Sequence, residues 1–185
     1  MKAATACWKS NARTKSLLCD TMQEPKILIS ACLLGEKVKY NGEDNRVEFL
    51  AAWAAANPSR FISVCPEAAG GLPIPRLPAE RQPDGRVVNV QGADVTTYFL
   101  AGAENVLRLA REHNIQIAIL KESSPSCGSA TIYDGTFSQR KISGQGVTAA
   151  LLRQHGIRVY SEKTLTEELF YSLTTGFFSS PFLNK

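Results

Sequence analysis

The sequence has no long hydrophobic run. No window holds eighteen consecutive apolar residues, so no membrane-spanning helix is expected. The chain also opens without the charged, apolar and small-residue pattern of a secretion signal. Its five cysteines are an odd number, which argues against a disulfide framework. Thiol or metal chemistry in the reducing cytoplasm is the expectation that follows.

The sequence also lacks a concentrated block of charge of one sign. The net charge is +4, and half of it lies in residues 1–25, so the remaining chain is nearly balanced. No basic stripe with interleaved aromatic residues is present, and a nucleic-acid partner is not expected. With 185 residues, 44% hydrophobic and 21% charged, the chain suits one globular domain with its own core.

Three segments are expected along the chain. Residues 1–25 show no sustained helical or strand period and are predicted to be a flexible leader, with Met22 as a candidate native start. Residues 26–175 are predicted to form an α/β domain. Residues 176–185 are predicted to be a C-terminal tail.

Within the predicted domain, short apolar runs alternate with helical patterns. The runs predict strands at 26–31, 61–64, 115–120 and 157–160, with a small extra strand at 86–90. The helices are expected at 46–56 with Asn45 as N-cap, 94–113, 144–155 and 164–173, and residues 70–84 are read as a loop. This alternation predicts a single three-layer α/β domain, Rossmann-like, with a mostly parallel sheet of four to five strands.

Three cysteines share one context. Cys32 in "ILISACLLG", Cys65 in "FISVCPE" and Cys127 in "ESSPSCGS" each follow the end of an apolar strand. Parallel strands bring their carboxyl ends to one edge, so the three thiols are expected to meet in one pocket. A single buried cysteine is as readily a small hydrophobic residue, but the repeated context favours a site. Cys7 and Cys19 lack this context and are read as incidental.

Three converging thiols leave several chemistries open. An iron–sulfur cluster normally takes four cysteines, so three would keep one iron without a protein ligand. Three cysteines and a water would instead make an open, catalytic zinc site. A thiol pair with a separate catalytic cysteine would need no metal.

The residues next to the thiols suggest further roles. Glu67 follows Cys65 closely and could act as a general acid or base, or serve only as a carboxylate at a helix start. Gly70 and Gly71 would let the backbone approach a ligand. The loop around Cys127 offers hydroxyl groups that could bind a substrate or a cluster sulfur, or stabilise a turn: Ser123, Ser124 and Ser126.

These segments stand in the order and spacing of a known family. The motifs "SACLLGEKVKYNG", "VCPEAAGGLPIPR", "GADVT" and "LKESSPSCGS" resemble the bacterial domain of unknown function 523 family, recognised as thiouracil desulfidases, over about residues 26–170. The resemblance implies a 4Fe–4S cluster held by Cys32, Cys65 and Cys127. It also implies that the open iron binds the sulfur of 2- or 4-thiouracil, which is converted to uracil and sulfide without net electron transfer.

The resemblance further implies a carboxylate and a serine that move protons and position the substrate. By motif these are Glu67 and Ser124, with Ser126 as the alternative hydroxyl. The expected substrate-binding residues are Ser126, Gly70, Gly71 and Lys121. The rival carboxylates for the acid–base role are Glu43, Glu48, Glu80 and Glu122.

The expected protein is thus a cytoplasmic enzyme, a monomer or homodimer, with a small thiolated nucleobase as its partner. Two alternatives stay open. One is a zinc-dependent hydrolase that uses the same three cysteines. The other is a non-catalytic module that binds a cluster or a small ligand.

Overall fold

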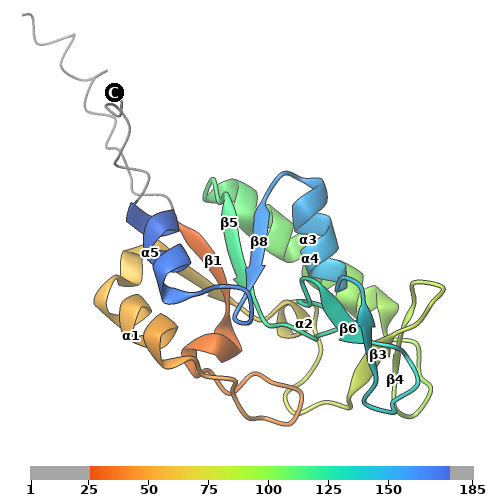
Figure 1. Cartoon of the computed structure of the whole chain (residues 1–185). Helices are drawn as coiled ribbons and strands as arrows, with labels where there is room; N and C mark the ends of the chain where they lie inside the picture. The colour runs from red at the N-terminus through yellow and green to blue at the C-terminus, as the bar shows by residue number, and fades with distance from the viewer. Residues whose placement is uncertain (1–25, 176–185) are drawn as a thin grey trace, which may run out of the picture.

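The central sheet of the domain has four parallel strands in the order β2-β1-β5-β8 (Figure 1). The computed structural model describes residues 26–175, so the expected leader and tail, with Cys7 and Cys19, lie outside the described residues. The strands are β1 (Ile27–Ser30), β2 (Phe61–Val64), β5 (Ile117–Leu120) and β8 (Arg158–Ser161). The longer helices are α1 (Glu48–Ala56), α3 (Thr96–Glu112), α4 (Val147–Gln154) and α5 (Glu167–Thr175).

The helices cover both faces of this sheet. All four residues of β1 are buried, as expected for a strand enclosed on both sides. Ile27 and Ile29 pack in the same core cluster as Phe170 of α5, whereas Leu28 packs in a second cluster with Val106 of α3. Figure 1 shows α1 and α5 on one side of the sheet and α3 and α4 on the other. The predicted three-layer, Rossmann-like α/β fold is therefore confirmed.

Two small antiparallel hairpins lie apart from the central sheet, at the lower right of Figure 1. They are β3 (Ala79–Arg81) with β4 (Val87–Asn89), and β6 (Thr131–Tyr133) with β7 (Lys141–Ser143). β4 confirms the extra strand predicted at 86–90. The prediction of a loop throughout 70–84 is wrong at β3, and β6 and β7 were not predicted. Three-residue strands carry too little alternation to be recognised, and β7 is exposed throughout.

All four predicted helices begin two or three residues later than expected. For α1, α3 and α4, tertiary hydrogen bonds hold the preceding residues. α1 begins at Glu48 with Val47 as N-cap, not Asn45. The Asn45 N–H donates to the Cys32 carbonyl, and the Val47 N–H to the Leu33 carbonyl, so this segment stays extended. None of the helices in residues 26–175 is both long and apolar enough to cross a membrane.

Candidate active site

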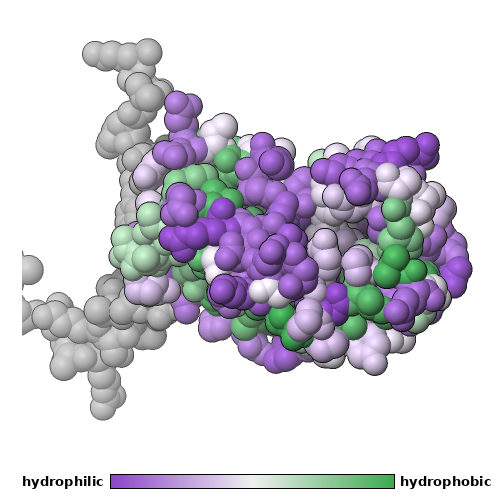
Figure 2. Space-filling model, turned by 90° about the horizontal axis from the view of Figure 1, so that it is seen from below, coloured by the Kyte–Doolittle hydropathy of each residue, from purple (hydrophilic) through white to green (hydrophobic). Residues whose placement is uncertain are grey.

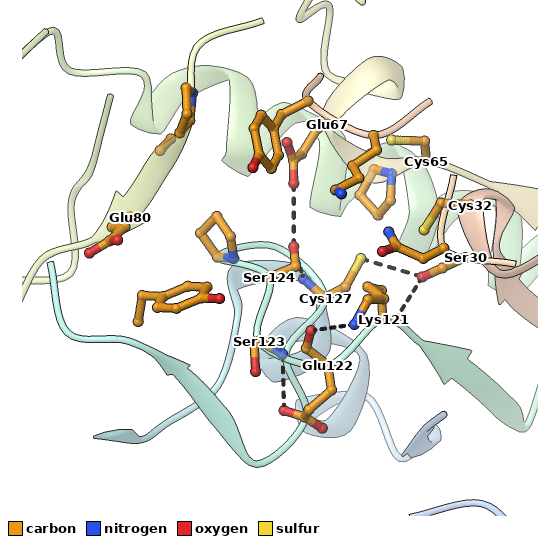
Figure 3. A pocket seen from close by; sticks show the side chains of 18 of the residues that line it. Ser30, Cys32, Cys65, Glu67, Glu80, Lys121, Glu122, Ser123, Ser124 and Cys127 are labelled. Atoms are coloured by element: carbon orange, nitrogen blue, oxygen red, sulfur yellow. Dashed lines mark hydrogen bonds between the residues drawn. The ribbon is translucent and has the colours of Figure 1, made fainter. Parts of the chain in front are cut away.

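A cavity of about 670 Å³ lies at the carboxyl ends of β1, β2 and β5. Its lining includes Cys32, Cys65 and Cys127, which come from three distant parts of the sequence and are all free thiols (Figure 3). In Figure 2, which views the molecule from below, hydrophilic side chains cover most of the face and hydrophobic ones gather in separate patches. Strand topology alone explains the convergence, because parallel strands end on one edge.

Cys32 sits in a tight turn directly after β1. The chain passes from Ser30 into the short helix η1 (Ala31–Leu34), which ends at Gly35 with a φ of +97°. That left-handed backbone is accessible to glycine at little cost. Burial raises the pKa of the Cys32 thiol, and a hydrogen bond with the Asn45 side chain partly opposes the shift.

Cys65 caps the start of a short helix. It is the N-cap of α2 (Pro66–Ala69), and Pro66 occupies the first turn, where its missing N–H costs no hydrogen bond. The Cys65 Sγ lies 3.7 Å from the Val38 carbonyl oxygen and 3.9 Å from Nη2 of Arg76. The thiol is therefore held at the wall of the cavity by two other segments.

Cys127 is the most enclosed of the three thiols, with 5% of its surface exposed. Ser30 Oγ donates to its Sγ at 3.5 Å and accepts the Lys121 N–H at 3.0 Å. Burial strongly raises the pKa of Cys127, against the opposing hydrogen bond from Ser30. In the absence of a cation the thiol therefore keeps its proton, and a metal would take the proton's place.

The loop that carries Cys127 folds around the buried carboxylate of Glu122. Its oxygens accept the N–H groups of Ser129, Ala130 and Thr131 at 2.8–3.1 Å and the Ser129 hydroxyl at 2.6 Å. Burial alone would raise the pKa of Glu122, but these hydrogen bonds outweigh it and lower the pKa to about 2. Glu122 is thus an ionised anchor for the loop, a role that sequence reasoning did not assign to it.

Ser124 and Glu67 face each other beside the thiols (Figure 3). The Ser124 hydroxyl donates to Oε1 of Glu67 at 3.3 Å. The Ser124 Oγ itself accepts the N–H groups of Ser126 and Cys127, each at 3.1 Å. Since both lone pairs of the hydroxyl are engaged, its hydrogen is directed at the carboxylate. Oε2 of Glu67 pairs with Nε of Arg76 at 2.7 Å.

Of the other residues expected to bind the substrate, only some line the cavity. Lys121 lines the cavity and pairs with Glu162 at 2.5 Å. Ser126 is 1% exposed, and its hydroxyl bonds that of Thr148 in α4 rather than facing the cavity.

The two expected glycines lie just beyond α2, and neither is among the described residues that line the cavity. A Cβ on Gly70 would stand 2.0 Å from the Tyr98 carbonyl oxygen, so this glycine allows α2 and α3 to pack closely. Gly71 has a φ of +96°, a left-handed backbone.

The rival carboxylates have other partners. Glu43 and Glu48 are exposed and pair with Lys39 and Arg46. Glu80 lines the cavity, is 8% exposed, and accepts backbone N–H groups from the loop between β6 and β7. These contacts leave Glu67 as the carboxylate paired with a serine next to the thiols.

Three residues of the site were missed in the sequence: Ser30, Asn45 and Arg76. Ser30 and Arg76 both stand within or beside quoted motifs, but their contacts to thiols depend on the tertiary fold. Within residues 26–175, no three histidine, cysteine or acidic side chains gather tightly enough to hold a single metal ion. The three thiols thus line the cavity from separate points.

A family model and a solved structure both relate this chain to thiouracil desulfurases. The family model described as 2-thiouracil desulfurase matches residues 27–164. The protein YbbK of Bacillus subtilis (strain 168), described as uncharacterized, is 43% identical over 152 residues, covering 77% of this chain and 99% of that protein. A solved structure of a 4Fe-4S-dependent thiouracil desulfidase, TudS (DUF523Vcz), is 49% identical with a TM-score of 0.74, covering 80% of this chain and 97% of that one.

Proposed function

This chain belongs to the 2-thiouracil desulfurase family, and from that premise we propose that it removes sulfur from thiolated pyrimidines such as 2- or 4-thiouracil. We further propose that Cys32, Cys65 and Cys127 hold a 4Fe–4S cluster, the cofactor named for the solved relative. The observation that carries this proposal is the convergence of three free thiols and a serine–carboxylate pair on one cavity.

The chemistry of the donors fits such a cluster. Thiolates are the ordinary ligands of iron–sulfur clusters, and the described residues offer three of them at one cavity. Hydrogen bonds from Ser30 and Arg76 reach the sulfurs of Cys127 and Cys65, as is common around cluster ligands. When bound, the cluster would supply an iron without a protein ligand, which is a Lewis acid for the substrate sulfur.

The proposed reaction consumes one water and one thiouracil and yields uracil and hydrogen sulfide, with no electrons transferred. Glu67 is the proposed base that takes a proton from the attacking water. The same carboxyl then returns a proton to the ring nitrogen or to the departing sulfur. Ser124, whose hydrogen points at Glu67, is proposed to position the substrate and pass the proton.

The remaining site residues have supporting roles in this proposal. Lys121, at the cavity surface, is proposed to contact the substrate directly. Ser126, Gly70 and Gly71 do not line the cavity and are proposed to act indirectly, by packing the segments behind it, since the Ser126 hydroxyl bonds Thr148 of α4 and Gly70 packs against α3.

The proposal needs one copy of the chain, so a monomer or a homodimer would carry it. It places the reaction in the cytoplasm, where cysteines stay reduced. The partner is a small thiolated nucleobase.

The test is anaerobic reconstitution followed by iron and sulfide analysis and a turnover assay with 2- and 4-thiouracil. Wild-type protein should bind about four irons, the number in a 4Fe–4S cluster, and release uracil and sulfide. Cys127→Ser should lose the cluster, whereas Cys7→Ser, outside the described residues, should keep it. Stoichiometric zinc in an active, colourless protein would favour the hydrolase, and a stable cluster without turnover would favour the binding module.

A further inference from the structure

Arg76 connects the proposed base to one of the proposed cluster ligands. Its Nε pairs with Glu67 Oε2 at 2.7 Å, and its Nη2 lies 3.9 Å from the Cys65 sulfur. The Arg76 side chain is 6% exposed and that of Glu67 14%. Loss of one partner from an ion pair so well shielded from water costs far more than loss of one from a surface pair, because it leaves a buried charge without its partner.

The backbone fixes the guanidinium independently of Glu67. Both terminal nitrogens of Arg76 donate to the Val38 carbonyl at 3.2 Å, and Nη1 also donates to the Pro73 carbonyl at 3.4 Å. Val38 follows the turn that carries Cys32, so Arg76 ties three segments of the cavity wall together. Only the planar, five-donor fork of arginine can satisfy all these acceptors at once, and a lysine cannot.

This arrangement divides the oxygens of Glu67 between two partners. Arg76 holds Oε2, which leaves Oε1 to accept the Ser124 hydroxyl. The plane of the carboxylate is therefore set by Arg76 before any substrate enters.

The ion pair between Arg76 and Glu67 also separates two cavities. A second cavity of about 350 Å³ shares Glu67, Arg76 and Ala79 with the main one, so the pair stands between them. Removal of the guanidinium would join the two spaces and let solvent reach the Glu67 carboxylate from behind.

The geometry points to Arg76 as a positioning residue for desulfuration, which orients the Glu67 carboxylate and donates an N–H to the Cys65 sulfur. This inference rests on the proposed function. Since hydrogen bonds to ligand sulfurs help set the reduction potential of a cluster, Arg76 has a readout separate from turnover.

The test compares wild type with Arg76→Met after anaerobic reconstitution. The variant should show a more negative midpoint potential, because one N–H donor and one positive charge are lost near the cluster. Its kcat should fall ~10- to 100-fold through misorientation of Glu67, with KM changed less than about threefold. In a Glu67→Gln background, assayed over long incubations, Arg76→Met should lower kcat by less than about twofold, because the carboxylate that it orients is already gone.

Arg76→Lys is the second variant, for the case that Arg76→Met does not bind the cluster. It keeps the charge but not the fork, so its kcat should still fall while its potential stays nearer to wild type. Arg60→Met is the matched control, because Arg60 is a buried arginine that does not line the cavity and donates to a backbone carbonyl, that of Thr174. It should lower the melting temperature and leave the potential and kcat unchanged.

Three results would overturn the inference. Wild-type kcat in both Arg76 variants would remove its positioning role, and so would an additive loss in the Glu67→Gln background. An unchanged midpoint potential would show that Arg76 does not act on the cluster through the Cys65 sulfur. Loaded wild-type protein that leaves both thiouracils intact would instead contradict the proposed function, and the shift in potential would still test Arg76.

Discussion

Ser124 is held by three hydrogen bonds, two accepted from backbone N–H groups and one donated to Glu67. Ser124→Ala removes the proposed proton path but leaves the three cysteines in place. The variant should therefore load a normal cluster and lose turnover by roughly 10²- to 10⁴-fold, the range typical of a lost acid–base group. Iron analysis and steady-state kinetics on the same preparation measure both quantities.

Ser123→Ala is the comparison variant in the same loop: Ser123 also lines the cavity, but its hydroxyl bonds that of Thr131 and not Glu67. Its turnover should stay within about threefold of wild type. Equal loss of turnover in the two variants would mean that the loop, rather than the Ser124 hydroxyl, limits the reaction.

Glu122 stabilises the folded protein through its charge. The pKa of this carboxyl is lowered from 4.5 to about 2, which corresponds to about 3 kcal/mol of folding free energy near neutral pH. Because the folded pKa is the lower one, this stability is complete above about pH 5 and is lost as the pH falls through 4.5 toward 2. Glu122→Gln should therefore lower the free energy of unfolding by about 3 kcal/mol at pH 7 and by about half as much at pH 3.

Denaturant unfolding of the cluster-free protein at the two pH values measures this difference. Glu104→Gln, on the exposed surface of α3, is the control and should change stability little at either pH. A penalty for Glu122→Gln that is equal at both pH values would show that the charge of Glu122 is not what stabilises the loop.

The role of a residue could be predicted from the sequence only where the residue directly follows a recognisable strand. The apolar runs before Cys32, Cys65 and Cys127 place the thiols at one edge of a parallel sheet by topology alone. The contacts of Arg76 are different in kind, since the Val38 carbonyl that holds it lies 38 residues away in the chain. No local pattern encodes such a contact.

At the scale of elements, the side chain of Glu80 in β3 holds the loop between β6 and β7. Glu80 accepts the N–H groups of Gly135 at 2.9 Å and Phe137 at 3.0 Å, and Phe137 has a left-handed φ of +59°. Phe137 also lines the cavity. Glu80→Ala should release this loop, raise KM for thiouracil about tenfold and leave cluster loading unchanged, because loss of a charge-assisted hydrogen-bond pair costs at least about 1.4 kcal/mol.

Limited proteolysis gives a second readout, with new cleavage expected in residues 134–140. Glu104→Ala is the control and should keep both KM and the cleavage pattern of wild type. If Glu80→Ala has wild-type KM and no new cleavage site, then other contacts hold the loop, such as the hydrogen bond from Gln82 to the Gly135 carbonyl.

The elements of the central sheet were predictable because their signals are local. Buried runs such as 27–29 and 117–120 are apolar throughout, and the alternation of strands and helices then implies the parallel order. Of the hairpin strands only β4 was predicted, because strands of three residues carry too little alternation to be recognised. The predicted start of α1 was wrong because long-range backbone hydrogen bonds to the carbonyls of Cys32 and Leu33 override the capping preference of Asn45.

At the scale of the whole molecule, most of the core consists of residues outside the site. Buried clusters on both faces of the sheet join all four strands to α1, α3, α4 and α5. The three cysteines lie beyond the strand ends, although Cys127 belongs to one buried cluster and Cys32 packs against the other. The cluster-free protein should therefore remain folded, with the far-ultraviolet circular dichroism of the loaded form.

A bound cluster would nevertheless cross-link the segments that follow β1, β2 and β5. A ligand that binds only the folded state at 100 times its dissociation constant adds about 2.7 kcal/mol of stability. For a domain of this size each kcal/mol raises the melting temperature by about 2–4 °C, so removal of the cluster with a chelator should lower it by roughly 5–10 °C. Anaerobic thermal denaturation before and after chelation measures the shift, and Cys127→Ser, which cannot complete the ligand set, should show none. Equal melting temperatures for the loaded and chelated wild type would mean that the cluster does not bridge these segments.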